Sequence, residues 1–113
     1  MQYNHHVSVS GLVVNENDEV LLVKNAFRGW ECPTGFVAEH ESLQNALERI
    51  ILDETGATVT IIDLVGINKD LTFNNVNVDF ICSISRYATS THKLQSGTLR
   101  FFTKARIIFT ASG

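Results

Sequence analysis

The chain has 113 residues, of which 44% are hydrophobic and 19% are charged, and its formal net charge is −3. This length and composition are typical of one globular domain, here residues 1–113, and they exclude a disordered chain. The slightly acidic balance argues against a nucleic-acid polymer as the main partner, because such proteins usually need a basic face. No apolar run approaches the ~18 residues of a membrane-spanning helix, so no membrane partner is expected.

The cysteines and the distribution of charge give two further expectations. Cys32 and Cys82 are too few for a disulfide framework, which predicts a reduced, cytoplasmic setting. All twelve acidic residues lie at or before Asp79, whereas five basic residues and no acid lie from Phe80 onward. This basic part is either a flank that attracts an anionic ligand or a solvated tail, and the sequence leaves both interpretations open.

Alternating and β-branched runs predict that most of the chain forms strands and loops. A hairpin is expected first, because two apolar runs flank the polar turn residues 15–19. The expected strands are residues 6–14, 20–24, 30–37 (interrupted by Pro33 and Gly35), 58–66, 76–85 and 98–103. The expected loops are residues 25–29, 68–75 and 87–97, and residues 104–113 fit either a short helix or a strand.

One helix is expected in the middle of the chain. The Ser42 hydroxyl can accept from the backbone donors of a first turn, so the helix begins there and runs to about Thr55. Gly56 suits the left-handed position that commonly ends a helix. One long helix inside a mostly β chain predicts an α+β fold in which the helix packs on a mixed sheet.

The segment from Gly35 to Ala57 carries the functional signal. It contains, in order, Gly35, Glu41, Arg49, Asp53, Glu54 and Gly56. Successive helical residues turn by about 100°, so positions 50, 53 and 54 share one face. Metal-assisted attack on a pyrophosphate needs carboxylates on one patch, beside a glycine that lets phosphates approach.

This spacing resembles the Nudix box, G-x5-E-x7-R-E-U-x-E-E-x-G-U, in which U is a bulky aliphatic residue. The stretch from Trp30 to Gly35 is similar to the W-x-x-P-G-G sequence that often precedes the box. The resemblance covers about residues 5–104 and implies a Nudix-type α/β/α sandwich with a mixed central sheet and a C-terminal helix that is short or missing. An ordinary amphipathic surface helix is the alternative, but it does not explain Gly35, Glu41 and Arg49 in register.

The resemblance implies hydrolysis of the pyrophosphate bond in nucleoside diphosphate-linked compounds, with Mg²⁺ or Mn²⁺ as cofactor. It assigns the metal ligands to Asp53, Glu54 and Glu41, and the catalytic set to these three residues and Arg49. Arg49 can pair with a carboxylate and hold it in place. A small nucleotide-type molecule is the expected partner, and the resemblance also allows a homodimer.

Position 50 departs from the pattern. The family carries a glutamate there, as a metal ligand or as the base that activates water, and Ile50 can do neither. Glu48 lies about 200° round the helix from that position and cannot replace it. Leu43, Leu47 and Ile50 instead continue an apolar stripe, which suggests that Ile50 belongs to the core. Two functions follow: a weak or atypical hydrolase, or a nucleotide-binding or regulatory module without turnover.

Residues around the box are candidates for substrate binding. Gly35 gives a close backbone approach, Trp30 can stack on a base, and Arg28 can meet a phosphate. Phe73 lies on an expected loop that could cover a ligand. Each also has a structural interpretation, since Trp30 and Phe73 suit a core and Arg28 suits an exposed surface.

Overall fold

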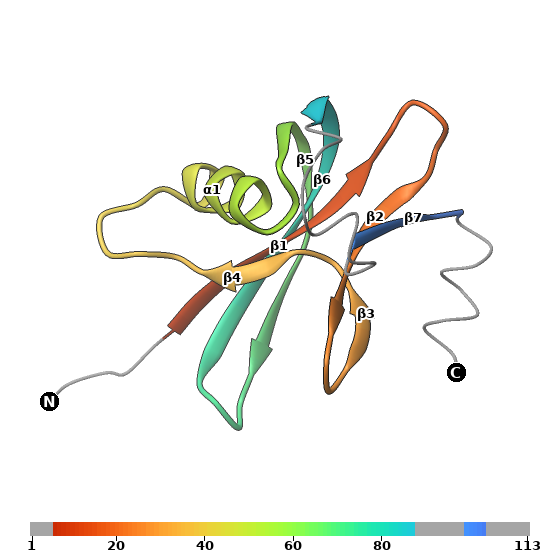
Figure 1. Ribbon diagram of the computed structural model, residues 1–113. Helices are drawn as coiled ribbons and strands as arrows, with labels where there is room; N and C mark the ends of the chain where they lie inside the picture. Colours follow the sequence, from red (N-terminus) through yellow and green to blue (C-terminus); the bar gives the residue numbers. More distant parts are fainter. Residues whose placement is uncertain (1–5, 88–98, 104–113) are drawn as a thin grey trace, which may run out of the picture.

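The computed structural model describes residues 6–87 and 99–103. Its elements are β1 (His6–Val14), β2 (Val20–Asn25), β3 (Gly29–Glu31), β4 (Thr34–Phe36), α1 (Leu43–Thr55), β5 (Ala57–Asp70), β6 (Asn75–Tyr87) and β7 (Leu99–Phe102). The described part therefore has the expected α+β composition, with one helix against a large mixed sheet (Figure 1). The expected loop 87–97 lies mostly outside the described residues, as does the whole of 104–113, including any C-terminal helix.

Strand β1 is the centre of the sheet. It pairs in parallel with β6 along its whole length, from His6 opposite Asn75 to Val14 opposite Ser83. On its other side β1 pairs with two strands in turn, because its first half faces β4 and its last residues face β2. The sheet order is β3-β2-β1-β6-β5, and β7 pairs with β2. The divergence of β4 from β2 brings the segment around Gly35 beside the helix.

Local chemistry fixes both ends of α1. The Ser42 hydroxyl accepts a hydrogen bond of 3.1 Å from the backbone N–H of Asn45, so it is the N-cap, as the sequence predicts. Gly56 adopts a left-handed φ of 77° and its N–H donates to the carbonyl of Leu52, which closes the last turn. The Thr55 hydroxyl donates to the carbonyl of Ile51 and accepts from the N–H of Ala57, which joins the helix to β5.

The two faces of the sheet have different environments. The main core lies under α1, where Leu47 and Ile51 of the helix meet Val9 and Val13 of β1, all fully buried. The alternate residues of β1 point to the opposite face. There a smaller apolar cluster contains Val20, Leu22 and Phe102, with Leu12, Val14, Trp30 and Cys32 packed against it. We call this second surface the open face, because no described helix covers it.

The structure corrects the predicted boundaries in the second half. Residues 68–70, expected in a loop, continue β5 to Asp70, where it pairs with Asn75 of β6. Asn68, Lys69 and Asp70 are exposed and polar, so they give no apolar signal, yet β6 provides a regular pairing partner for them. Phe73 therefore lies on a short hairpin turn and not on a long covering loop. The segment 30–37 is divided into β3 and β4 on either side of Pro33.

Candidate functional site

A glutamate and an arginine form a clamp between α1 and the loop that follows β4. Arg49 Nε donates to Glu41 Oε2 over 2.9 Å, and Arg49 Nη2 donates to Glu41 Oε1 over 3.0 Å. Nη2 also donates to the backbone carbonyl of Phe36 at 3.1 Å. Two parallel bonds from a planar guanidinium to a carboxylate fix both groups in orientation. The predicted pairing of Arg49 with a carboxylate is therefore confirmed, with Glu41 as the partner.

The loop that carries Glu41 is folded back on itself. The Ala38 N–H donates to Glu41 Oε1 at 3.0 Å, and the Glu41 N–H donates to the Ala38 carbonyl at 3.2 Å. His40, the residue before Glu41, has a φ of 65°, in the left-handed region that non-glycine residues rarely adopt. The Arg49 hydrogen bonds, followed by that from Ala38, lower the pKa of Glu41 to about 2. Glu41 is thus held as a carboxylate, and both of its oxygens accept hydrogen bonds.

Ile50, the neighbour of Arg49, points into the core. Its side chain is 5% exposed and belongs to the apolar cluster under α1. A Cβ built on Gly35 would lie 2.7 Å from Ile50 Cδ1 and 2.9 Å from Ile50 Cγ1. Gly35 therefore leaves room for the Ile50 side chain, and position 50 faces the strand that carries the box glycine. The expectation that Ile50 is a core residue is confirmed.

The acidic pair lies at the last turn of α1. Asp53 is exposed, and its charge contributes to raising the pKa of Arg49, although the hydrogen bond to Glu41 is the larger cause. Glu54 is half-buried and its Oε2 atom is buried. The helical spacing predicts both acids on the side of position 50. In the structure the Ile50 side chain is buried, that of Glu54 is half-buried and that of Asp53 is exposed. The three side chains therefore differ in their access to solvent.

No group of three or more His, Cys, Asp or Glu side chains that could hold a metal ion occurs among residues 6–87 and 99–103. Two carboxylates of the box, Asp53 and Glu54, lie on α1 itself, and both oxygens of Glu41 accept hydrogen bonds from Arg49 and Ala38. Magnesium is commonly bound through one or two carboxylates together with substrate phosphates and water. This donor set therefore fits a metal that is shared with substrate, and it does not fit a metal ligated by protein alone.

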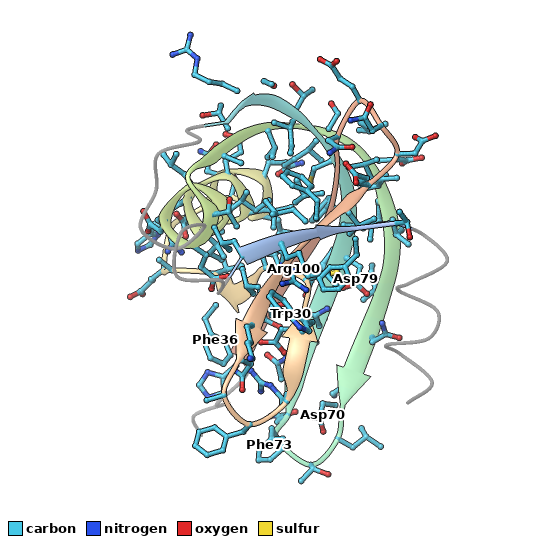
Figure 2. All side chains as sticks on the ribbon, turned by 45° about the vertical axis from the view of Figure 1, so that its right-hand side comes forward. Trp30, Phe36, Asp70, Phe73, Asp79 and Arg100 are labelled. Carbon is cyan, nitrogen blue, oxygen red and sulfur yellow. The ribbon has the colours of Figure 1, made fainter. Side chains whose placement is uncertain are left out.

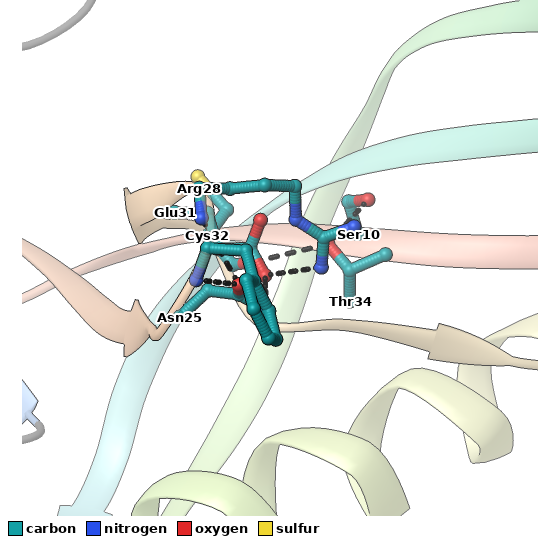
Figure 3. Close-up of polar contacts among 7 residues, drawn as sticks. Ser10, Asn25, Arg28, Glu31, Cys32 and Thr34 are labelled. Atoms are coloured by element: carbon teal, nitrogen blue, oxygen red, sulfur yellow. Dashed lines mark hydrogen bonds and ion pairs between the residues drawn. The ribbon is translucent and has the colours of Figure 1, made fainter.

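The residues singled out for substrate binding lie in three different places. Arg28 is paired with Glu31 at 3.0 Å, within a set of polar contacts around β3 and β4 (Figure 3). Trp30 lies on the open face, where its ring centroid is 5.1 Å from that of Phe102 in an edge-on arrangement. Phe73 is 72% exposed on the β5–β6 turn. The structure therefore does not bring these side chains together with Asp53 and Glu54 into one pocket.

Sequence reasoning missed two groups of residues on the open face. One is a polar network in which Asn77 accepts from Ser8 and donates to Asp79, which also accepts from Asn68. The other is a pair of cations, Lys24 and Arg100, beside Trp30. Both depend on strand register, because their members are far apart in sequence. The alternation of polar residues along 75–79 is the signal that could have indicated the first group.

Comparison with known proteins connects this geometry to a family. A model of the NUDIX domain matches residues 4–102. The chain belongs to the Nudix family. A MutT-like protein of Streptomyces ambofaciens is 35% identical over 82 residues, which cover 72% of this chain and 53% of that protein. Nudix hydrolase 8 of Arabidopsis thaliana is 28% identical over 89 residues, which cover 72% of this chain and 24% of that protein.

Solved structures agree with this assignment. A NUDIX hydrolase from Nitrosomonas europaea superimposes with a TM-score of 0.76 and 25% identity, over 93% of this chain and 61% of that chain.

This chain spans only about half the length of the Streptomyces relative and a quarter of the Arabidopsis one. In the described part of the Nudix chain, no helix is long and apolar enough to cross a membrane.

Proposed function

We propose that this Nudix domain hydrolyses the pyrophosphate bond of a nucleoside diphosphate-linked compound, weakly or atypically, with Mg²⁺ or Mn²⁺. The observation that supports this proposal most is the clamp of Glu41, Arg49 and the Phe36 carbonyl beside the acidic turn of α1. A surface helix with no function has no need of a bidentate ion pair whose glutamate follows a glycine by six residues, as in the box. Relatives named as hydrolases agree with the proposal.

Each residue has a role in the proposed reaction. Asp53 and Glu54 would hold the metal ion, which when bound would neutralise phosphate charge and make a bound water a better nucleophile. Arg49 holds Glu41 ionised and in place. A direct metal contact of Glu41 remains a prediction, because its oxygens already accept from Arg49 and Ala38. Gly35 lets α1 approach β4.

A second function, binding without turnover, is favoured by Ile50. At the position where the family has a glutamate, an apolar side chain is buried against Gly35. That arrangement removes a carboxylate from the metal side of the helix. A nucleotide-binding or regulatory module would keep the clamp and the glycine, and would not need the missing acid.

Product release from a nucleotide panel tests the proposal. ADP-ribose, a dinucleoside polyphosphate and a nucleoside triphosphate are each incubated with Mg²⁺, with Mn²⁺ and with EDTA. We expect metal-dependent cleavage of at least one compound, and a loss of about 10²-fold or more in kcat/KM in Glu54→Gln. Glu48→Gln, an exposed glutamate on the same helix but another flank, is the matched control and should leave the rate within about twofold.

The outcomes separate the two functions. Cleavage that survives unchanged in Glu54→Gln would show that Glu54 has no role in the reaction. Metal-dependent binding of a nucleotide without any cleavage, measured by calorimetry, would favour the binding module instead.

A further inference from the structure

Three residues from three strands meet on the open face, away from α1. Lys24 of β2 lies directly opposite Trp30 of β3, and Arg100 of β7 lies opposite Leu22 of β2. Opposite residues of an antiparallel pair point to the same side of the sheet, so Lys24, Arg100 and Trp30 share the face of Leu22. Lys24 and Arg100 are diagonal neighbours, for which about 7–8 Å between Cα atoms is usual. We call this set the cation–tryptophan patch.

Both cations are directed at one aromatic ring. Lys24 Nζ lies 6.0 Å from the centroid of the Trp30 ring, and Arg100 Cζ lies 5.6 Å from it. Trp30 is held by its edge contact with Phe102, and Figure 2 shows it beside Arg100. Each cation–π contact at an exposed site contributes only about 0.5–1 kcal/mol. The ring therefore compensates little of the repulsion between two like charges.

Among the described residues, the two cations of the patch lie outside the ion pairs. Neither Lys24 nor Arg100 forms an ion pair with any carboxylate of residues 6–87 and 99–103. Glu31 is opposite Val23 in the β2–β3 pair, so it points to the other side of β3 from Trp30, where it binds Arg28. Asp79 accepts from two neutral amides, those of Asn77 and Asn68. Within the described residues, the patch therefore holds two cations that no ion pair neutralises, next to a partly buried aromatic ring.

From this arrangement we propose that Lys24, Arg100 and Trp30 form a binding site for a phosphate group of a nucleotide-type ligand. A guanidinium presents parallel N–H donors that match phosphate oxygens, and the lysine ammonium adds a point charge. The Trp30 ring can contact the sugar or base that carries the phosphate. The site lies on the sheet face opposite α1, so it is separate from Asp53 and Glu54. It does not depend on the chain being a hydrolase.

The single tryptophan of the chain makes this site directly observable. The full chain is titrated with pyrophosphate and with ADP in EDTA, which prevents metal-dependent turnover, while Trp30 fluorescence and heat of binding are recorded. We expect a saturable change with both ligands, weakened by added salt. Lys24→Gln and Arg100→Gln should each raise the Kd by about tenfold or more, because one charge-assisted contact is lost.

Three controls define the site. Lys69→Gln removes an exposed cation from β5 and should leave the Kd within about twofold. Adenosine, which has no phosphate, should not compete with pyrophosphate. Circular dichroism and the thermal unfolding midpoint verify that each variant is folded.

The proposal is overturned by any of four results. The wild-type chain shows neither heat nor fluorescence change up to about 10 mM pyrophosphate, where any Kd of biological relevance would be detected. Lys24→Gln and Arg100→Gln both bind as tightly as the wild type. Lys69→Gln weakens binding as much as they do, which would indicate a non-specific charge effect. Adenosine binds as tightly as ADP, which would identify a base platform without a phosphate site.

Discussion

Arg49 and Ile50 are adjacent in α1, yet they belong to opposite environments. Arg49 is exposed and fixes Glu41 and the Phe36 carbonyl, whereas Ile50 is 5% exposed and packs against Gly35. One residue turns the helix by about 100°, which is enough to separate the solvent side from the core side. The clamp of a Nudix box can therefore persist while a neighbouring carboxylate position becomes part of the hydrophobic core.

The largest loss of stability is expected from shortening a side chain on the core side of α1. Ile50→Ala removes a buried side chain next to Gly35 and Leu47, and should lower the free energy of unfolding by about 2–5 kcal/mol. Leu52→Ala on the same helix is the matched control. Because Leu52 is 51% exposed, this change should lower the free energy of unfolding much less. Urea unfolding of the two variants measures the difference. Equal losses would place Ile50 outside the core.

A smaller loss is expected from filling the space at Gly35. In Gly35→Ala the new Cβ would meet Ile50 at 2.7–2.9 Å, so Ile50 must move, and we expect a cost of about 1–3 kcal/mol. The double variant Gly35→Ala with Ile50→Val gives the methyl group more room and should cost less than the two single changes together. If the two changes are simply additive in urea unfolding, Gly35 and Ile50 are not coupled.

On the solvent side, the clamp should affect activity more than stability. Arg49→Lys keeps the charge but cannot form two parallel bonds to Glu41 and a third to the Phe36 carbonyl. We expect a lower kcat/KM for any substrate found, with a smaller shift in the unfolding midpoint than Gly35→Ala causes. Unchanged kinetics would show that orientation of Glu41 is not required.

The smallest effect is expected in the pH dependence of stability. The pKa of Glu41 is lowered from 4.5 to about 2 by Arg49 and Ala38, so the folded chain keeps this carboxylate ionised where the unfolded chain protonates it. Its stabilisation is complete above about pH 4.5 and is lost as the pH falls toward 2. Thermal unfolding midpoints between pH 6 and 2 should fall more steeply in the wild type than in Glu41→Gln. Parallel curves would contradict the role of the clamp.

Much of this architecture is predictable from local chemistry. The Ser42 cap, the left-handed Gly56 and the spacing of Leu43, Leu47 and Ile50 indicate the helix, its ends and its buried side. The extension of β5 through Asn68, Lys69 and Asp70 is not predictable in this way. Those residues are exposed, and they form a strand only because β6 supplies pairing partners.

The candidate site also has one part that is predictable from local spacing and one part that depends on strand pairing. The Glu41–Arg49 pair follows from box spacing, because both residues lie near one helix flank. The meeting of Lys24, Trp30 and Arg100 depends on two strand pairings, between β2 and β3 and between β2 and β7, that a single sequence does not reveal. Long-range register is therefore the information that sequence patterns lack in this chain.

Ile50→Glu tests whether position 50 belongs to the core and not to the proposed metal site. The free energy of unfolding and the metal-dependent kcat/KM of this variant are measured beside those of Ile50→Gln. Glutamine has the shape of glutamate without its charge. We expect both variants to be destabilised, the glutamate variant by about 3 kcal/mol or more, with no gain in rate, because a buried unpaired carboxylate is costly. A glutamate variant as stable as the wild type and about tenfold or more faster would instead place position 50 at the metal site.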